Sequence, residues 1–145
     1  MYKKELFRKL DQKHDSHLYT GIQGFFIKNG HRQLENFKKK NSHLSKILEI
    51  GAGSTPHYNF IKHSYDEYHI VETSDYAMNY HKENTKVQLS KYDGKNLPYK
   101  NETFDRIIIS HCLEHILSPE DFLNEMMRVL KKGGVLSISL PTDPG

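Results

Sequence analysis

The chain has 145 residues, of which 36% are hydrophobic and 27% are charged, a composition that suits one globular domain with its own core. Its single cysteine, Cys112, excludes an internal disulfide and a multi-cysteine metal site, so a reducing cytoplasm is the expected location. No apolar stretch approaches the roughly 20 residues that cross a bilayer, and the N-terminus lacks the apolar core of a signal peptide, so no membrane span is expected.

The net charge of +3 is distributed unevenly along the chain. Residues 1–46 carry 11 Lys and Arg against 4 Asp and Glu, whereas the remainder carries 10 against 14. A basic arm on a mildly acidic domain could attract an anionic substrate, a nucleic acid or a membrane surface. A solvated helical face explains the same charges and is the preferred interpretation.

Residues 17–40 have apolar side chains at roughly helical spacing, and Gly30 predicts a break into two helices. Residues 1–45 are therefore expected to form an N-terminal helical segment. Residues 46–145 are expected to form a separate core that binds the ligand.

From residue 46 onward, short apolar runs alternate with helical patterns. The predicted strands are Ile47–Ile50, Glu67–Glu72, the polar and edge-like Lys86–Ser90, Phe104–Ser110, which should be buried on both faces, and Val135–Leu140. The predicted helices are Pro56–His63, capped by Ser54 or Thr55, Asp75–Glu83, capped by Ser74 or Asp75, and Pro119–Leu130, which stops at Lys131-Lys132-Gly133-Gly134. This alternation predicts an α/β fold with a doubly wound parallel sheet that binds ligands beyond the carboxyl ends of its strands.

The first predicted strand runs directly into a glycine bend, Gly51-Ala52-Gly53, and the second ends at Glu72, 21 residues after Gly51. The glycines let the backbone approach a ligand closely, and an acid at the tip of the second strand can accept hydrogen bonds from a ribose. Pro56 stands where a dinucleotide fingerprint needs its third glycine, which makes an NAD-dependent dehydrogenase the least favoured interpretation. Glu49, an acid inside an apolar strand, could meet the ammonium of a methionine moiety or order nearby backbone amides.

In these segments the chain resembles the class I S-adenosylmethionine-dependent methyltransferases, in the broad small-molecule group often called type 11. The resemblance spans residues 46–141. It is carried by Ile47-Leu-Glu-Ile-Gly-Ala-Gly-Ser54, Ile70-Val-Glu72-Thr-Ser, Asp93-Gly-Lys-Asn-Leu-Pro-Tyr99 with Phe104-Asp105, Ser110-His-Cys-Leu-Glu-His-Ile116 and Leu130-Lys-Lys-Gly-Gly-Val-Leu136. It implies a Rossmann-like sheet of strand order 3-2-1-4-5 and S-adenosylmethionine as the cofactor.

The resemblance also implies a set of residues that contact the cofactor. Glu72 would hold the ribose hydroxyls, Thr73 would lie against the adenine, and Asp93 would accept a hydrogen bond from the adenine amino group. The full implied set is Glu49, Gly51, Ala52, Gly53, Glu72, Thr73, Asp93, Gly94 and Ser110. Taken singly, Glu72 is better explained as a solvated loop acid and Asp93 as a helix or turn cap, and only the pattern of segments together favours cofactor contact for both.

His111 and His115 are the candidate catalytic residues, as pocket groups or general bases. If residues 111–117 were helical, Glu114 would share a face with both histidines, and the three side chains could bind a metal. A site without metal is preferred, and histidines that are merely hydrogen-bonded at a strand–helix junction remain an alternative. Methyl transfer needs little from side chains, because the sulfonium is already an activated donor.

Relatives in this family continue past the fifth strand with a helix and an antiparallel pair of strands, for which this sequence has no room. The expectation is a truncated product, a fragment, or a chain in which a second copy covers the apolar edge of the fifth strand. The leading functional hypothesis is methyl transfer to a small-molecule acceptor. The alternatives are a non-catalytic or partner-completed cofactor-binding domain, and a less favoured nucleic-acid methyltransferase that would use the basic N-terminus.

Overall fold

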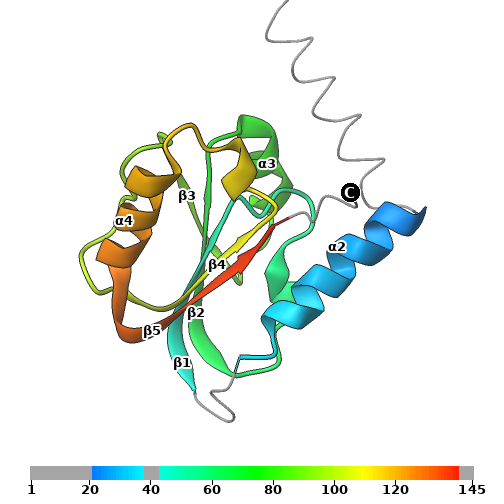
Figure 1. The fold of residues 1–145 in the computed structure, drawn as a ribbon, viewed down its shortest axis with the longest axis horizontal. Helices are drawn as coiled ribbons and strands as arrows, with labels where there is room; N and C mark the ends of the chain where they lie inside the picture. Colours follow the sequence, from blue (N-terminus) through cyan, green and yellow to red (C-terminus); the bar gives the residue numbers. More distant parts are fainter. Residues whose placement is uncertain (1–20, 38–42, 141–145) are drawn as a thin grey trace, which may run out of the picture.

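Five parallel strands form one sheet in the order β3-β2-β1-β4-β5 in the computed structural model, which describes residues 21–37 and 43–140 (Figure 1). The order confirms the predicted Rossmann-like topology, with the polar β3 at one edge and β4 inside the sheet. The strands are β1 (Leu44–Ile50), β2 (Tyr65–Glu72), β3 (Gln88–Lys91), β4 (Phe104–Ser110) and β5 (Leu130–Ser139).

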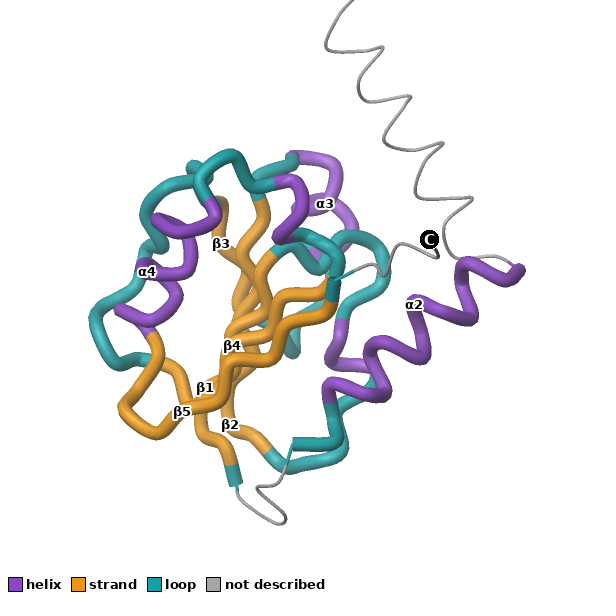
Figure 2. The backbone as a smooth tube through the Cα atoms, in the orientation of Figure 1, coloured by secondary structure: helices purple, strands orange, loops and turns teal. Residues whose placement is uncertain are grey.

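Helices lie on both faces of the sheet, with α2 and α4 on opposite sides (Figure 2). Ser74 caps α3 as predicted, because its Oγ accepts a hydrogen bond from the backbone nitrogen of Tyr76 at 3.2 Å. None of the helices in the described part of the chain is both long and apolar enough to cross a membrane. The helices are α2 (Gly21–Leu34), α3 (Asp75–His81) and α4 (Pro119–Val129), and there are two 3-10 turns, η1 (His57–Asn59) and η2 (Leu113–His115).

The sheet separates two cores of different character. Alternate residues of β1 and β4 point to opposite faces, so Leu48 and Ile107 face one core while Ile47 and Ile108 face the other. The core on the α4 side is built from aliphatic and aromatic side chains, including Phe122 of α4 itself. The core on the α2 side also buries several ionisable groups.

The predicted helix over Pro56–His63 is wrong, because only the short η1 forms there. Side-chain carboxylates accept from two backbone N–H groups of this segment, and a helix would pair the second of these, that of Lys62, internally. Glu49 accepts from the nitrogen of His57 at 2.7 Å, and Glu35 accepts from the nitrogen of Lys62 at 2.8 Å. The predicted cap is wrong as well, since Pro56 precedes η1 in an extended conformation and no side chain caps the turn.

The predicted break at Gly30 is also wrong, since α2 runs through it to Leu34. The glycine instead allows a close approach to β5, because a Cβ at Gly30 would lie 3.1 Å from Ser139 Oγ. The parts of the predicted helical stretch at 17–20 and 38–40 lie outside the described residues.

The fifth strand begins five residues earlier than predicted, directly after α4. Leu130 pairs with Phe104 and Val135 pairs with Arg106, so the residues between Leu130 and Val135 form an irregularity in the ladder rather than a loop. Gly133 within this irregularity has φ of 73°, a conformation that favours glycine. The glycine that was expected to end the helix therefore lies in an irregular part of the strand.

A buried polar cluster attaches α2 to the sheet. Arg106 of β4 donates from Nη1 to Glu35 Oε1 at 2.6 Å and from Nη2 to the carbonyl of Leu34 at 2.8 Å. His57 Nε2 donates to the same Glu35 oxygen at 2.7 Å, and its Nδ1 lies 2.9 Å from His31 Nδ1 of α2. Burial would raise the pKa of Glu35, but the bonds from His57 and Arg106 lower it to about 2. The carboxylate is therefore ionised at neutral pH and organises the contacts that hold α2.

The His31–His57 contact predicts acid sensitivity of the fold. Burial, together with nearby His57 and His111, lowers the pKa of His31 to about 3. An unfolded chain takes up this proton near pH 6.5, so it binds more protons than the folded chain between about pH 6.5 and 3. The free energy of unfolding should therefore fall as the pH drops through that window, as measured by urea denaturation at pH 7 and pH 5.

His31→Asn serves as the matched variant, because the asparagine amide can replace the Nδ1 donor but cannot titrate. The decrease in stability between pH 7 and pH 5 should be smaller in this variant, whatever its stability at pH 7. An unchanged decrease would exclude His31 as the source and leave His57 and His81, whose pKa values burial also lowers.

Candidate functional site

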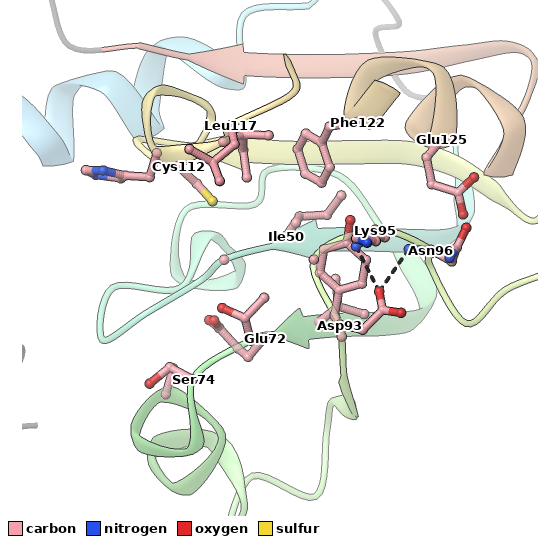
Figure 3. A pocket seen from close by; sticks show the side chains of 18 of the residues that line it. Ile50, Glu72, Ser74, Asp93, Lys95, Asn96, Cys112, Leu117, Phe122 and Glu125 are labelled. Atoms are coloured by element: carbon pink, nitrogen blue, oxygen red, sulfur yellow. Dashed lines mark hydrogen bonds between the residues drawn. The ribbon is translucent and has the colours of Figure 1, made fainter. Parts of the chain in front are cut away.

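A cavity of about 1120 Å³ opens at the carboxyl ends of the strands, where β1 and β4 lie side by side. From β1 the sheet is extended on one side by β2 and β3 and on the other side by β4 and β5. The position between β1 and β4 is therefore the topological switch point, where open α/β sheets bind ligands. Figure 3 shows Glu72 and Ser74 on one side of the cavity and Cys112, Leu117 and Phe122 on the other.

The glycine bend and the acid at the tip of β2 are in direct contact. Gly53 donates its backbone N–H to Glu72 Oε1 at 2.7 Å, and Gly51 donates to the carbonyl of Val71 at 3.0 Å. Both glycines have positive φ, 68° at Gly51 and 52° at Gly53, a conformation that favours glycine. Gly51, Gly53 and Glu72 all line the cavity.

Three residues of the implied cofactor set, Glu49, Ala52 and Ser110, are not among the residues that line the cavity. Glu49 is buried on the α2 side, where it accepts from the backbone of His57 and, at 2.8 Å, from the hydroxyl of Tyr68. Burial raises the pKa of Glu49 to about 8, so this carboxyl group is protonated at neutral pH. Glu49 was expected either to meet the ammonium of the methionine moiety or to order a backbone amide. Its bond from the His57 nitrogen corresponds to the second role.

The segment after β3 brings Asp93 and Gly94 to the cavity, while Thr73 reaches it from the end of β2. Asp93 Oδ1 accepts the backbone N–H groups of Lys95 and Asn96 at 2.8 and 2.9 Å (Figure 3). These bonds lower the pKa of Asp93 and close the turn in which it lies. The carboxylate therefore caps a turn and also lies at the cavity, so the two expectations for this residue are compatible.

His111 and His115 both line the cavity, but their surroundings differ. His111 has φ of 51°, and its Nε2 is buried with no hydrogen-bond partner within the described ranges. The side chain of His115 is 76% exposed. Since only the short η2 forms here, Glu114 and the two histidines do not share a helical face. Across residues 21–37 and 43–140, no group of three His, Cys, Asp or Glu side chains is arranged to hold a metal ion.

Several lining residues were not predicted. Tyr92 and Phe122 form an aromatic wall with ring centroids 6.2 Å apart, and the Tyr92 hydroxyl is buried without a partner among the described residues. Cys112 packs over Gly51, and burial raises the pKa of its thiol to about 11, so it is no nucleophile at neutral pH. An aromatic residue directly before Asp93 was the only sequence signal for this wall.

These features define what the cavity can bind. It combines a glycine bend without bulky side chains, the carboxylate of Glu72, which can accept hydrogen bonds, an aromatic wall, and the apolar ends of β1 and β2. Such a site suits a ligand with a flat ring, a hydroxylated sugar and a cationic portion.

The family model described as Methyltransferase domain matches residues 48–138 of the chain. Norajmaline N-methyltransferase of Rauvolfia serpentina is 42% identical over 53 residues, which cover 37% of this chain and 18% of that enzyme. Demethylmenaquinone methyltransferase of Corynebacterium urealyticum is 45% identical over 56 residues, which cover 37% of this chain and 24% of that enzyme. The chain thus matches less than a quarter of the length of either relative.

The crystal structure of a SAM dependent methyltransferase from Aquifex aeolicus superposes with a TM-score of 0.63 and 20% identity. The superposition covers 81% of this chain and 68% of the Aquifex chain, so the two share a fold. Because the family match includes the glycine bend, Glu72, Asp93 and both cavity histidines, it covers the site as well as the sheet. The chain therefore belongs to the methyltransferase domain family and has the class I fold of enzymes whose cofactor is S-adenosylmethionine.

Proposed function

We propose that this chain binds S-adenosylmethionine in the cavity beyond β1 and β4 and transfers its methyl group to a small-molecule acceptor. The observation that carries the proposal is the 2.7 Å bond between Gly53 and Glu72 at the wall of that cavity. This bond places the Glu72 carboxylate beside a glycine bend, where no bulky side chain keeps a ligand from the backbone. The names of the matching relatives, an alkaloid-type N-methyltransferase and a quinone methyltransferase, favour a small acceptor.

The residues present fit the cofactor. A Cβ at Gly51 would lie 2.7 Å from Cys112 Sγ, so the position must stay bare for the backbone to lie where it does. Glu72 would hold the ribose hydroxyls, Asp93 and Gly94 would meet the adenine, and Tyr92 would contribute its ring and buried hydroxyl. The bound cofactor supplies an activated methyl group on a sulfonium, so the protein's task is to orient the acceptor in line with it.

His111 is the residue we assign to the acceptor side. Its left-handed backbone conformation is costly for a residue with a Cβ, and such strain tends to occur at functional sites. Its Nε2 is buried beside Gly30 of α2 with no partner among the described residues, so this nitrogen could take up the proton that an acceptor hydroxyl or amine releases. His115, more exposed, would contact the outer part of the acceptor. A second copy covering the β5 edge, the division at residue 45 and a cytoplasmic location stay predictions.

Isothermal titration with S-adenosylhomocysteine tests the cofactor site. Glu72→Ala should raise the Kd at least about tenfold, because bonds from hydroxyls to a charged acceptor contribute about 1.5–3 kcal/mol each. Glu67→Ala, on the same strand but paired with Lys46 at the opposite end, should leave the Kd unchanged. Glu72→Gln separates charge from shape, since its amide oxygen can still accept from Gly53.

Two results would count against the proposal. A wild-type chain that does not bind S-adenosylhomocysteine would refute cofactor binding, and an unchanged Kd in a folded Glu72→Ala variant would refute the role of Glu72. Binding without turnover of any hydroxyl or amine acceptor would favour a non-catalytic cofactor-binding domain.

A further inference from the structure

The peptide units on both sides of Gly53 are held by side chains from two different elements. Its N–H donates to Glu72 Oε1 of β2 at 2.7 Å, and its carbonyl oxygen accepts from His81 Nε2 of α3 at 2.7 Å. These two bonds flank the Cα of Gly53, so together they restrain both of its backbone torsion angles. A glycine has more conformational freedom than any other residue, so such restraints matter most at this kind of position.

His81 acts from behind the bend and not from within the cavity. Its residue is 1% exposed, and it is not among the residues that line the cavity. The ring packs edge-on against Tyr58 at 6.5 Å and against Tyr80 at 5.1 Å between centroids. The imidazole is therefore fixed in orientation by its own neighbours, as a group that positions another must be.

The imidazole donates this bond as a neutral group. A carbonyl oxygen can only accept, so the proton lies on Nε2, while Nδ1 is buried with no partner among the described residues. Burial lowers the pKa of His81 despite the bond to Gly53. A neutral donor suits this place, because a positive charge behind the bend would repel a cationic sulfonium ligand.

We infer that His81 is a positioning residue for the cofactor bend, holding the Gly53 carbonyl so that the Gly53 N–H and Glu72 are already arranged when the ligand enters. This inference rests on the proposed function. Without the bond from His81 to the Gly53 carbonyl, the bend samples more conformations. The ligand must then order the bend on binding, and this entropic cost weakens its affinity. The sequence provides no sign of this role, because His81 lies 28 residues from Gly53 at the end of a helix with no motif.

The test compares two substitutions of the same residue. His81→Gln can keep a donor at the position of Nε2, whereas His81→Leu fills similar space without a donor. We expect the Kd for S-adenosylhomocysteine, measured by isothermal titration, to rise about tenfold in His81→Leu and less than about threefold in His81→Gln. Asn79→Ala, at an exposed position two residues earlier on α3, is the matched control and should bind as the wild type does.

Hydrogen–deuterium exchange of the ligand-free chain gives a second measurement. The backbone amides of Gly53 and Ser54 should exchange faster in His81→Leu than in His81→Gln. Rescue by glutamine in both measurements supports the inference. Equal weakening by leucine and glutamine, or a lowered thermal midpoint in His81→Leu with an unchanged Kd, would overturn the inference while leaving the proposed function intact. A wild-type chain that does not bind S-adenosylhomocysteine would overturn the proposed function and this inference with it.

Discussion

Arg106→Met is expected to lower the free energy of unfolding by about 3–5 kcal/mol, because it leaves a buried carboxylate without its cation. The side chains of Arg106 and Glu35 are 0% and 1% exposed, and Nη1 lies 2.6 Å from Glu35 Oε1. The guanidinium also donates to the carbonyl of Leu34 and to Ser137 Oγ, and lies 3.0 Å from His63 Nε2. No other described side chain could replace these contacts from β4.

Urea denaturation followed by circular dichroism measures this loss. Lys131→Met is the matched control, since it removes a partly exposed pair with Asp105 and should cost less than about 1 kcal/mol. The double substitution Arg106→Met with Glu35→Met should recover part of the loss, because no unpaired charge then remains buried. If Arg106→Met is no more costly than Lys131→Met, the buried pair does not hold α2 to the sheet.

Gly51→Ala is expected to raise the Kd for S-adenosylhomocysteine about a hundredfold. Gly51 has φ of 68°, a conformation that costs a residue with a Cβ about 1–3 kcal/mol. The new Cβ would lie 2.7 Å from Cys112 Sγ and 3.2 Å from Cys112 Cβ, so the bend and the start of η2 must move apart. Both segments line the cavity, and their displacement would change the shape of the site itself.

Gly94→Ala separates the two causes. Gly94 also lines the cavity and has φ of 87°, but a Cβ there meets nothing within 4 Å. It should therefore show no clash inside the protein and a smaller loss of affinity. The double substitution Gly51→Ala with Cys112→Ala should regain part of the binding. Equal Kd values for Gly51→Ala and Gly94→Ala would show that the contact with Cys112 is unimportant.

The sheet and the bend could be predicted because local pattern determines them. Ile107–Ile109 has the continuous apolar character of a strand covered on both faces. Gly51 and Gly53 directly after a strand favour a tight bend, because glycine adopts positive φ at little cost. Glu72 ends a strand that pairs with β1, so parallel geometry brings it to the bend without any long-range information.

The errors arose where side chains distant in sequence compete with local preference. In the segment after Pro56, the N–H of Lys62, which a helix would pair internally, donates instead to Glu35, 27 residues away in the sequence. The same limit applies to Arg106, whose carboxylate partner is 71 residues away. A charge inside an apolar strand signals that a partner must exist, but only the fold shows which residue it is.

The unlike cores on the two faces of the sheet give the domain two kinds of vulnerability. The flank under α4 depends on keeping water away from hydrocarbon, a force that weakens on cooling and in urea. The flank under α2 depends on the buried ion pair of Arg106 and Glu35 and on histidines that burial keeps neutral, His31 and His57, so protons act on it more directly. Acid would therefore loosen α2 while the α4 side keeps its packing. The attachment of α2 to the sheet is thus the part of this domain that a change of pH can alter.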